Sequence, residues 1–390
     1  MSAEQPLIER ARQLSDVHWH EAPPGCFSHH RCDGHDLHLK FGSIASGRGA
    51  GVSVVLIDTG PMQLTVLPTR GMGIWQVVCD GVPFKWNSPV TGPIHPSLVP
   101  QFDPNGLGWL EGFDEFMVRC GMASNGAPDF DESGQLLYPL HGRIANTPAD
   151  RIWSEVDGDE CVLGGDLHEQ RLFFHNLRLT SRIRVNPGCR SICIEDTITN
   201  LSGQTSTSQM LYHVNIGKPV LAGSCRLHIP CSEMAPRDAV AAAWPGQPDR
   251  CDNAKSGFQE VVDFYRMHAD DQHETAVLLE NPQSETGLGL IYDTRTLPCF
   301  VVWKNFAGHQ DGYVLGLEPA TNFPNTRTFE GLHGRVTTLE PGQSITHRLE
   351  IWPLVGSGPL SDFGQRVAAL KTDLPPVIHE QPRVDWSPQV

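Results

Sequence analysis

Long apolar runs are missing from this chain of 390 residues. A membrane-spanning helix needs about 20 consecutive apolar residues, and no segment of the sequence supplies them. The N-terminal residues also lack a basic stretch followed by an apolar one, which is the pattern of a secretory signal. We therefore expect a protein that does not enter a membrane and that resides in the cytoplasm.

Basic side chains are scarce as well. Lys and Arg together number 29 against 45 Asp and Glu, which gives a formal net charge of −16. Nucleic-acid-binding proteins carry basic patches, and the sequence has no run of Lys or Arg that could form one. The composition therefore argues against a nucleic-acid partner, and the excess of acidic side chains is expected to serve solubility.

Regular cysteine spacings are also absent. The 11 cysteines are odd in number and scattered, so we expect free thiols and no disulfide framework. The stretch 18–38 is rich in histidine, but Cys26 and Cys32 are too far apart for the close ligand pairs of a zinc site. We interpret this stretch as a solvated loop, and we expect neither a metal nor another cofactor.

No alternation of strands with helices is visible, and no G-x-G-x-x-G motif follows a strand, so a dinucleotide-binding fold is not expected. What the sequence does contain is a series of short β-branched runs, separated by turn residues, over residues 40–355. Two of them, LRLTSRIRV and SICIEDTITN, alternate clearly and are joined by the turn VNPGCR, as in a β-hairpin. The pattern predicts an all-β fold, namely a large antiparallel β-sandwich with few short helices.

The chain is expected to divide into three segments. Residues 1–40 would form a helix over 5–15 and the histidine-rich loop, residues 41–356 the sandwich, and residues 357–390 a helix followed by a Pro-rich extended tail. Inside the sandwich, residues 86–112 are rich in Pro and Gly and show no periodicity. A loop of this length in a compact domain is usually functional.

The segment MLYHVNIG carries the first candidate site residues. Side chains alternate between the two faces of a strand, so His213 and Asn215 would share one face while Tyr212 and Val214 share the other. Two polar groups that point the same way could form a hydrogen-bonding site. They could equally form the outward polar side of a sheet, because histidine has many roles.

The segment YVLGLEP ends an apolar run with a carboxylate, Glu318. A carboxylate beside apolar side chains is partly desolvated, which raises its pKa and makes it a better base near neutral pH. The alternative is an ordinary glutamate at the end of a strand, facing water.

Other polar or aromatic residues near strand ends are candidates for substrate contacts. Arg70 precedes a Gly-rich turn in TRGMGIW, Arg119 lies in FMVRCGM, and His141 begins a His-Gly-Arg turn. Trp303 could stack on the apolar face of a ligand ring, although a tryptophan is more often part of a core. Taken singly, none of these motifs is specific.

Together the motifs resemble the galactose mutarotase (aldose 1-epimerase) superfamily. The resemblance rests on the chain order of Arg119, the His141–Gly142 pair, the strand containing His213, and Glu318. The segments TRGMGIWQ, WNSP, CGM, LHGRIANTPA, YHVNIGKP and GLEPATNFPN are similar to its DUF4432-type branch. The similarity covers roughly residues 50–355, which is most of the chain.

The resemblance implies a sandwich of two large sheets with a sugar site on a concave face. It implies an isomerase in which His213 is the general acid and Glu318 the general base, without metal or cofactor. His141 and Arg119 would then hold ring hydroxyls, with Arg70 and Asn215 as further contacts. The resemblance is also compatible with a homodimer, since broad β faces of proteins in this superfamily sometimes pair.

The surroundings of His213 depart from the superfamily's usual His-Thr/Ser-Tyr-Phe-Asn stretch, because the chain reads His-Val-Asn-Ile-Gly there. Two alternatives therefore stay open. One is a lyase or hydrolase acting on an oxidised sugar, which could use a metal held by His141, His213 and Glu318. The other is a sugar-binding protein without catalytic activity, since a fold does not fix a function.

Overall fold

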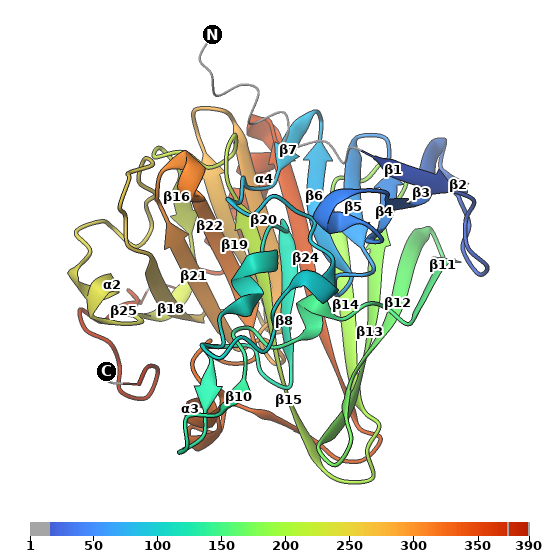
Figure 1. Cartoon of the computed structure of the whole chain (residues 1–390). Coiled ribbons are helices and arrows are strands. Elements are labelled where there is room, and N and C mark those ends of the chain that lie inside the picture. The colour runs from blue at the N-terminus through green and yellow to red at the C-terminus, as the bar shows by residue number, and fades with distance from the viewer. Residues whose placement is uncertain (1–15, 373, 389–390) are drawn as a thin grey trace.

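The computed structural model describes residues 16–372 and 374–388, so the helix expected over residues 5–15 lies outside the described residues. Two large sheets pack face to face, one of 15 strands and one of eight (Figure 1). Within both large sheets the pairing is antiparallel, apart from a short parallel contact between β17 and β25. The predicted antiparallel β-sandwich is therefore confirmed.

The larger sheet has the path β1-β3-β4-β5-β6-β8-β15-β22-β21-β18-β17-β25, with β2, β7 and β23 paired beside it. Its strands are β1 Val17–His20, β2 His29–Cys32, β3 His35–Ile44, β4 Ser53–Asp58, β5 Met62–Leu67, β6 Gly73–Cys79, β7 Val82–Phe84, β8 Met117–Met122, β15 Ser206–Ile216, β17 Cys231–Pro236, β18 Val261–Met267, β21 Cys299–Asn305, β22 Val314–Ala320, β23 Thr337–Leu339 and β25 Val377–Ile378.

The smaller sheet has the order β11-β12-β13-β14-β24-β20-β19-β16. Its strands are β11 Arg151–Asp157, β12 Glu160–Arg171, β13 His175–Val185, β14 Ile192–Asn200, β16 Arg226–His228, β19 Glu274–Asn281, β20 Thr286–Asp293 and β24 Ser344–Val355. The predicted hairpin is present, because β13 and β14 pair in antiparallel register on either side of the VNPGCR turn.

The helices are short and lie outside the two sheets. They are α2 Ala239–Ala243, α3 Arg327–Leu332 and α4 Ser357–Ala369, with 3-10 turns η1 Gly47–Gly49, η2 Pro96–Leu98, η3 Gly108–Gly112, η4 Ile144–Asn146 and η5 His309–Asp311. A two-stranded hairpin of β9 Asp129–Phe130 and β10 Leu136–Tyr138 stands apart from both sheets. The helix expected near the C-terminus is therefore present as α4. No helix among the described residues has the length and apolar character needed to cross a membrane.

The histidine-rich stretch is not a loop, and that prediction is wrong. It contains β1, β2 and the start of β3, which form one edge of the larger sheet. Strand β3 buries Leu37, Leu39 and Phe41 on one face, and this alternation is what makes it a strand. Strand β3 also crosses residue 40, where the sequence suggested a boundary, while the division into three segments stays a prediction.

The core lies between the two sheets. Every second residue of the central strands enters it, such as Tyr212 and Val214 from β15 and Ile194 from β14. The other face of the larger sheet carries a smaller apolar cluster that includes Trp86, Trp109 and other residues of the long loops. In Figure 1 the teal segments between β7 and β11 lie in front of β8 and β15. The outer face of the central strands is thus covered by loops and not by a second sheet.

Candidate active site

The site is built on the outer face of the four adjacent strands β8, β15, β22 and β21. Val214 of β15 pairs with Leu317 of β22, so the neighbouring residues His213 and Glu318 lie opposite each other on the next rung. Their Nε2 and Oε1 atoms are 3.2 Å apart. The sheet therefore brings together the two residues that the sequence offered as acid and base.

Both side chains are almost fully buried, with 4% of His213 and 2% of Glu318 exposed. Although Nε2 and Oε1 are close, their contact lacks hydrogen-bond geometry: among the described residues Glu318 Oε1 has no hydrogen-bond partner, and neither has His213 Nδ1. A buried polar atom without a partner costs about 1–3 kcal/mol. A ligand bound beside these two residues could satisfy both atoms, which makes the pair a candidate site.

Aromatic rings surround His213 on the outer face. The centroid of its imidazole lies 5.1 Å from that of Phe113, 5.3 Å from Trp303 and 6.3 Å from Trp109. Phe113 and Trp109 come from the loop region that follows β7, while Trp303 comes from β21. Aromatic faces of this kind can stack on the C–H face of a sugar ring.

Burial moves the pKa values of the pair in opposite directions. For His213, burial and the neighbouring His141 lower the pKa well below its ordinary value of 6.5, against the opposing effect of the Asn215 side chain. For Glu318, burial and the Glu260 carboxylate raise the pKa well above 4.5, against the opposing effect of Arg237. Both shifts favour the uncharged forms, a neutral imidazole beside a protonated carboxyl group.

A pair that holds one proton can act as acid and base at once. Moving that proton from Glu318 to His213 creates an imidazolium and a carboxylate without any exchange with solvent. The reverse transfer restores the neutral pair. One group can thus donate a proton to a substrate while the other accepts one, which is the requirement for general acid–base chemistry.

His141 lies beside this pair, with its ring centroid 5.6 Å from that of His213 and 4.5 Å from that of Trp109. Its backbone has a φ of 57°, a left-handed conformation that is uncommon for a residue other than glycine and costs roughly 1–3 kcal/mol. The next residue must be glycine, because a Cβ on Gly142 would lie 2.0 Å from the carbonyl oxygen of Ser124. The tight turn explains how the His-Gly pair brings an imidazole to the site.

The imidazole of His141 is neutral at physiological pH. Burial lowers its pKa from 6.5 to about 4, against the opposing effects of the Asn125 carbonyl and Glu260. Its Nδ1 lies 2.9 Å from the Asn125 carbonyl oxygen, which can only accept a hydrogen bond. The Nδ1 atom therefore carries the proton, and Nε2 is left as the acceptor of the ring.

Gly316 gives the pair its space. It lies on β22 opposite Asn215 and Trp303. A Cβ at this position would lie 2.7 Å from Glu318 Oε1 and 3.0 Å from His213 Cε1. Any side chain here would displace the acid–base pair, so this glycine shapes the site although no sequence motif singled it out.

Trp303 and Asn215 both lie at the site, with different partners. The indole Nε1 of Trp303 donates to Glu260 at 2.7 Å, and Glu260 also accepts from Arg237 at 3.1 Å. Asn215 is buried and uses its Nδ2 on the carbonyl oxygens of Glu115 and His213. Its Oδ1 is in hydrogen-bond geometry with no described residue, although the Asn215 side chain interacts with the His213 imidazole and opposes the lowering of its pKa.

Arg119 does not reach the site, in contrast to the expectation from the sequence. It pairs in register with Tyr212, so both side chains point into the core between the sheets. Its guanidinium donates to Asp196 and Ser181 on the smaller sheet and to two backbone carbonyls. Arg119 joins the two sheets, and the outer face is out of its reach.

Arg70 is likewise occupied inside the protein. Its guanidinium donates to Glu115 at 2.6 Å, to Asn146 at 2.8 Å and to the carbonyl oxygens of Ile94 and Gly112. It is 2% exposed. The side chain thus ties the loop before β8 to the β5–β6 turn, and the structure does not bring it to His213.

Among residues 16–372 and 374–388, no group of three or more His, Cys, Asp or Glu side chains is arranged to hold a metal ion. His141, His213 and Glu318 therefore do not form the three-ligand set that the sequence left open. The sequence also missed Phe113, Asn125 and Glu260, which contact the site residues. Only Phe113 had a signal, since it directly follows the long loop that was expected to be functional.

The fold is that of the galactose mutarotase-like proteins. Similar solved structures include a galactose mutarotase-like protein from Clostridium acetobutylicum, at 12% identity and a TM-score of 0.57 over 82% of this chain and 99% of that chain. Another, from Lactobacillus casei ATCC 334, has 15% identity and a TM-score of 0.51 over 77% and 99% of the two chains. At these identities the likeness shows the fold alone.

Residues 49–352 match the family described as a domain of unknown function, DUF4432, and the chain belongs to this family. A similar structure comes from Klebsiella pneumoniae subsp. pneumoniae MGH 78578 and is provisionally named an aldose 1-epimerase. It shares 31% identity and a TM-score of 0.86, over 90% of this chain and 92% of that chain. No curated protein matches this sequence.

Proposed function

We propose that this chain is an isomerase that interconverts the anomers of a free aldose by acid–base ring opening. The observation that carries the proposal is the buried pair of His213 and Glu318, 3.2 Å apart, unsatisfied and walled by aromatic rings. The reaction needs one proton donor and one proton acceptor and no nucleophile, which is what this pair supplies.

In the proposed reaction Glu318, as a carboxylate, removes the proton from the anomeric hydroxyl. The C1–O5 bond breaks, its electron pair goes to O5, and O5 takes a proton from the His213 imidazolium. The C1–O1 bond becomes the carbonyl of the open aldehyde. Rotation about C1–C2 and the reverse proton transfers close the ring as the other anomer. The pair begins and ends with the same single proton.

The surrounding residues would hold the sugar. The rings of Trp303 and Phe113 would contact its C–H face, while His141 Nε2 and Asn215 Oδ1 would accept hydrogen bonds from its hydroxyls. Arg70 and Arg119 take no part, because their donors are already used within the protein. The sugar itself, a cytoplasmic location and a homodimer stay predictions.

The test is to follow anomer exchange by NMR across a panel of aldoses, with the spontaneous exchange subtracted. We expect Glu318→Gln and His213→Asn each to lose about 10²–10⁴-fold in rate while remaining folded. His347→Asn is a matched control, because His347 is a buried histidine of the smaller sheet whose pKa is also lowered, to about 4. Its exchange rate should equal that of the parent protein.

Two outcomes would overturn the proposal. If both variants exchange anomers as fast as the parent protein, His213 and Glu318 are not the acid and base. If the parent protein accelerates exchange of no aldose, the isomerase proposal fails. The same variants would then be assayed on keto-sugars. Turnover of a keto-sugar by the parent protein that is lost in Glu318→Gln would favour a lyase or hydrolase. Sugar binding without turnover in the parent protein, with the same affinity in Glu318→Gln, would favour a binding protein.

A further inference from the structure

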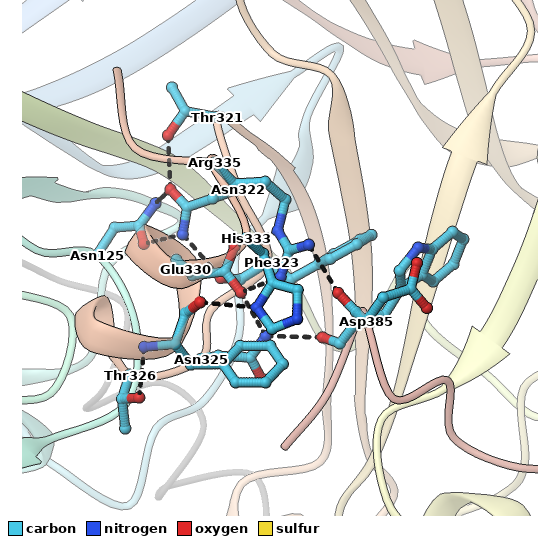
Figure 2. A network of polar contacts seen from close by, with 12 residues as sticks. Asn125, Thr321, Asn322, Phe323, Asn325, Thr326, Glu330, His333, Arg335 and Asp385 are labelled. Atoms are coloured by element: carbon cyan, nitrogen blue, oxygen red, sulfur yellow. Dashed lines mark hydrogen bonds and ion pairs between the residues drawn. The ribbon is translucent and has the colours of Figure 1, made fainter. Parts of the chain in front are cut away.

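The carbonyl that holds His141 belongs to a residue with a partner of its own. Asn125 is fully buried, and its side chain forms a reciprocal amide pair with Asn322 (Figure 2). Asn125 Nδ2 donates to Asn322 Oδ1 at 3.0 Å, and Asn322 Nδ2 donates to Asn125 Oδ1 at 2.8 Å. The pair therefore fixes the segment whose carbonyl oxygen accepts from His141 Nδ1.

Asn322 is held from its other side as well. Its Oδ1 accepts from the Thr321 hydroxyl at 2.7 Å, and its Nδ2 also donates to the Phe323 carbonyl at 2.7 Å (Figure 2). Thr321 is bonded in turn to the backbone of Met210 on β15. Asn322 is the second residue after β22, the strand of Glu318, so the amide pair ties the His141 loop to the strand that carries the proposed base.

The turn that holds Asn322 is anchored on the C-terminal segment. Asn325 Nδ2 donates to Glu330 at 2.6 Å and to the Trp386 carbonyl at 2.8 Å, and Arg335 donates to both oxygens of Glu330 (Figure 2). Trp386 itself is buried and packs on Phe323, with ring centroids 4.9 Å apart. The Pro-rich C-terminal tail thus packs against the turn that contains Asn322 and helps to hold it in place.

In this series of hydrogen bonds the carbonyl oxygens fix which group is the donor and which is the acceptor. A carbonyl oxygen cannot donate, so the Asn125 carbonyl selects the imidazole form that has its proton on Nδ1. The amide of Asn322 is oriented by Thr321 and by the Phe323 carbonyl oxygen, and it orients the amide of Asn125 in turn.

We propose that Asn125 and Asn322 are positioning residues that hold His141 as its Nδ1–H tautomer, so that Nε2 accepts a hydrogen bond from a substrate hydroxyl. The role of Nε2 rests on the proposed function. The tautomer does not, and it can be measured without any sugar.

The experiment uses the full chain labelled with ¹⁵N-histidine and long-range ¹H–¹⁵N correlation spectra, in which a protonated ring nitrogen differs clearly from an unprotonated one. The variant His141→Gln identifies the signals of His141. We expect the parent protein to show a single tautomer protonated at Nδ1, and Asn322→Ala to show a mixture. Asn200→Ala is the matched control, since Asn200 is an equally buried asparagine bonded to Gln204 and Leu339.

A tautomer protonated at Nε2 in the parent protein would overturn the proposal, and so would an unchanged His141 signal in Asn322→Ala. Should the alanine variant fail to fold, Asn322→Asp keeps the shape and the acceptor oxygens but loses both donations. It is expected to give the same mixture, and an unchanged tautomer there would overturn the proposal.

If an aldose is turned over, Asn322→Ala should lower kcat/KM by at least about tenfold, because an imidazole held in the wrong tautomer loses much of its contribution. The His141 spectrum separates the two claims. A correct tautomer in a protein that turns over no aldose would contradict the proposed reaction and leave the positioning role supported. A mixed tautomer with unchanged kcat/KM would contradict the role of Nε2.

Discussion

The two faces of β15 differ in how their polar groups are satisfied. On the inner face, Tyr212 donates its hydroxyl to Asp196, which also accepts from Arg119, so the buried charges are paired across the two sheets. On the outer face, one residue along, His213 and its neighbour Glu318 are equally buried but keep atoms without a hydrogen-bond partner among the described residues. The inner face of β15 thus contributes to the stability of the fold, and its outer face carries the candidate site.

Two buried side chains that carry ionisable groups, Arg119 and Glu318, illustrate the difference between the two faces. Arg119 looks like a substrate contact by its residue type, yet all its hydrogen bonds stay inside the protein. Glu318 looks like a strand-end carboxylate, yet the residues around it leave one oxygen free. Hydrogen-bond satisfaction, and not charge or burial, distinguishes the two.

The largest effect is expected on the inner face. Arg119→Met should lower the free energy of unfolding by about 3–5 kcal/mol, because it leaves Asp196 buried and unpaired. Arg295→Met removes an exposed ion pair with Asp293 and should cost far less, because solvent screens such a pair. Urea denaturation of both variants measures this. A loss below about 1 kcal/mol in Arg119→Met would contradict the view that the inner face depends on its paired charges.

A smaller effect is expected when the outer face is crowded. In Gly316→Ala the added methyl group would push against Glu318 and His213, and a misplacement of about 1 Å can cost roughly 10²-fold in activity. Gly331→Ala is the control, since a Cβ there meets no atom within 4 Å. Anomer-exchange rates of the two variants test this, and equal rates would show that the geometry of the pair does not matter.

The smallest effect is a difference in how stability depends on pH. Because the pKa of Glu318 is raised well above 4.5 in the folded protein, the folded state binds more protons than the unfolded state above pH 4.5. The contribution of Glu318 to the free energy of unfolding is therefore fully present below pH 4.5, and it is lost as the pH rises through the pKa that Glu318 has in the folded protein.

The variant Glu318→Gln cannot titrate at this position. Its stability relative to the parent protein should therefore increase as pH rises above 4.5, and urea denaturation at a series of pH values measures the difference. A constant difference between Glu318→Gln and the parent would show that Glu318 is ionised at rest.

Part of this molecule could be predicted from its sequence because side-chain alternation is a local property. It gave the sandwich, and it put His213 and Asn215 on one face of a strand. The meeting of His213 with Glu318 came from the resemblance, since the pairing of β15 with β22 is not local. The same alternation in HDLHLKF indicates strand β3, but the density of histidines there favoured a loop.

The positions of Arg70 and Arg119 could not be predicted, because their partners lie far away in the chain. Asp196 is on the other sheet, and nothing in the sequence indicates which carboxylate Arg119 will meet. The packing of Trp386 against Phe323 could not be predicted either, because a Pro-rich tail with one tryptophan has no periodic pattern. Chain topology, and not residue type, decided these roles.

The alternation of Tyr212 and His213 also restricts which sequence changes this chain can accept. Between β8 and β22, strand β15 is paired on both sides, and a shift of one residue would turn every side chain to the opposite face. His213 would enter the core and Tyr212 would face the aromatic wall. Substitutions can therefore change the site one side chain at a time. Insertion or deletion of a single residue within β15 would instead exchange the side chains of the inner face with those of the outer face all at once.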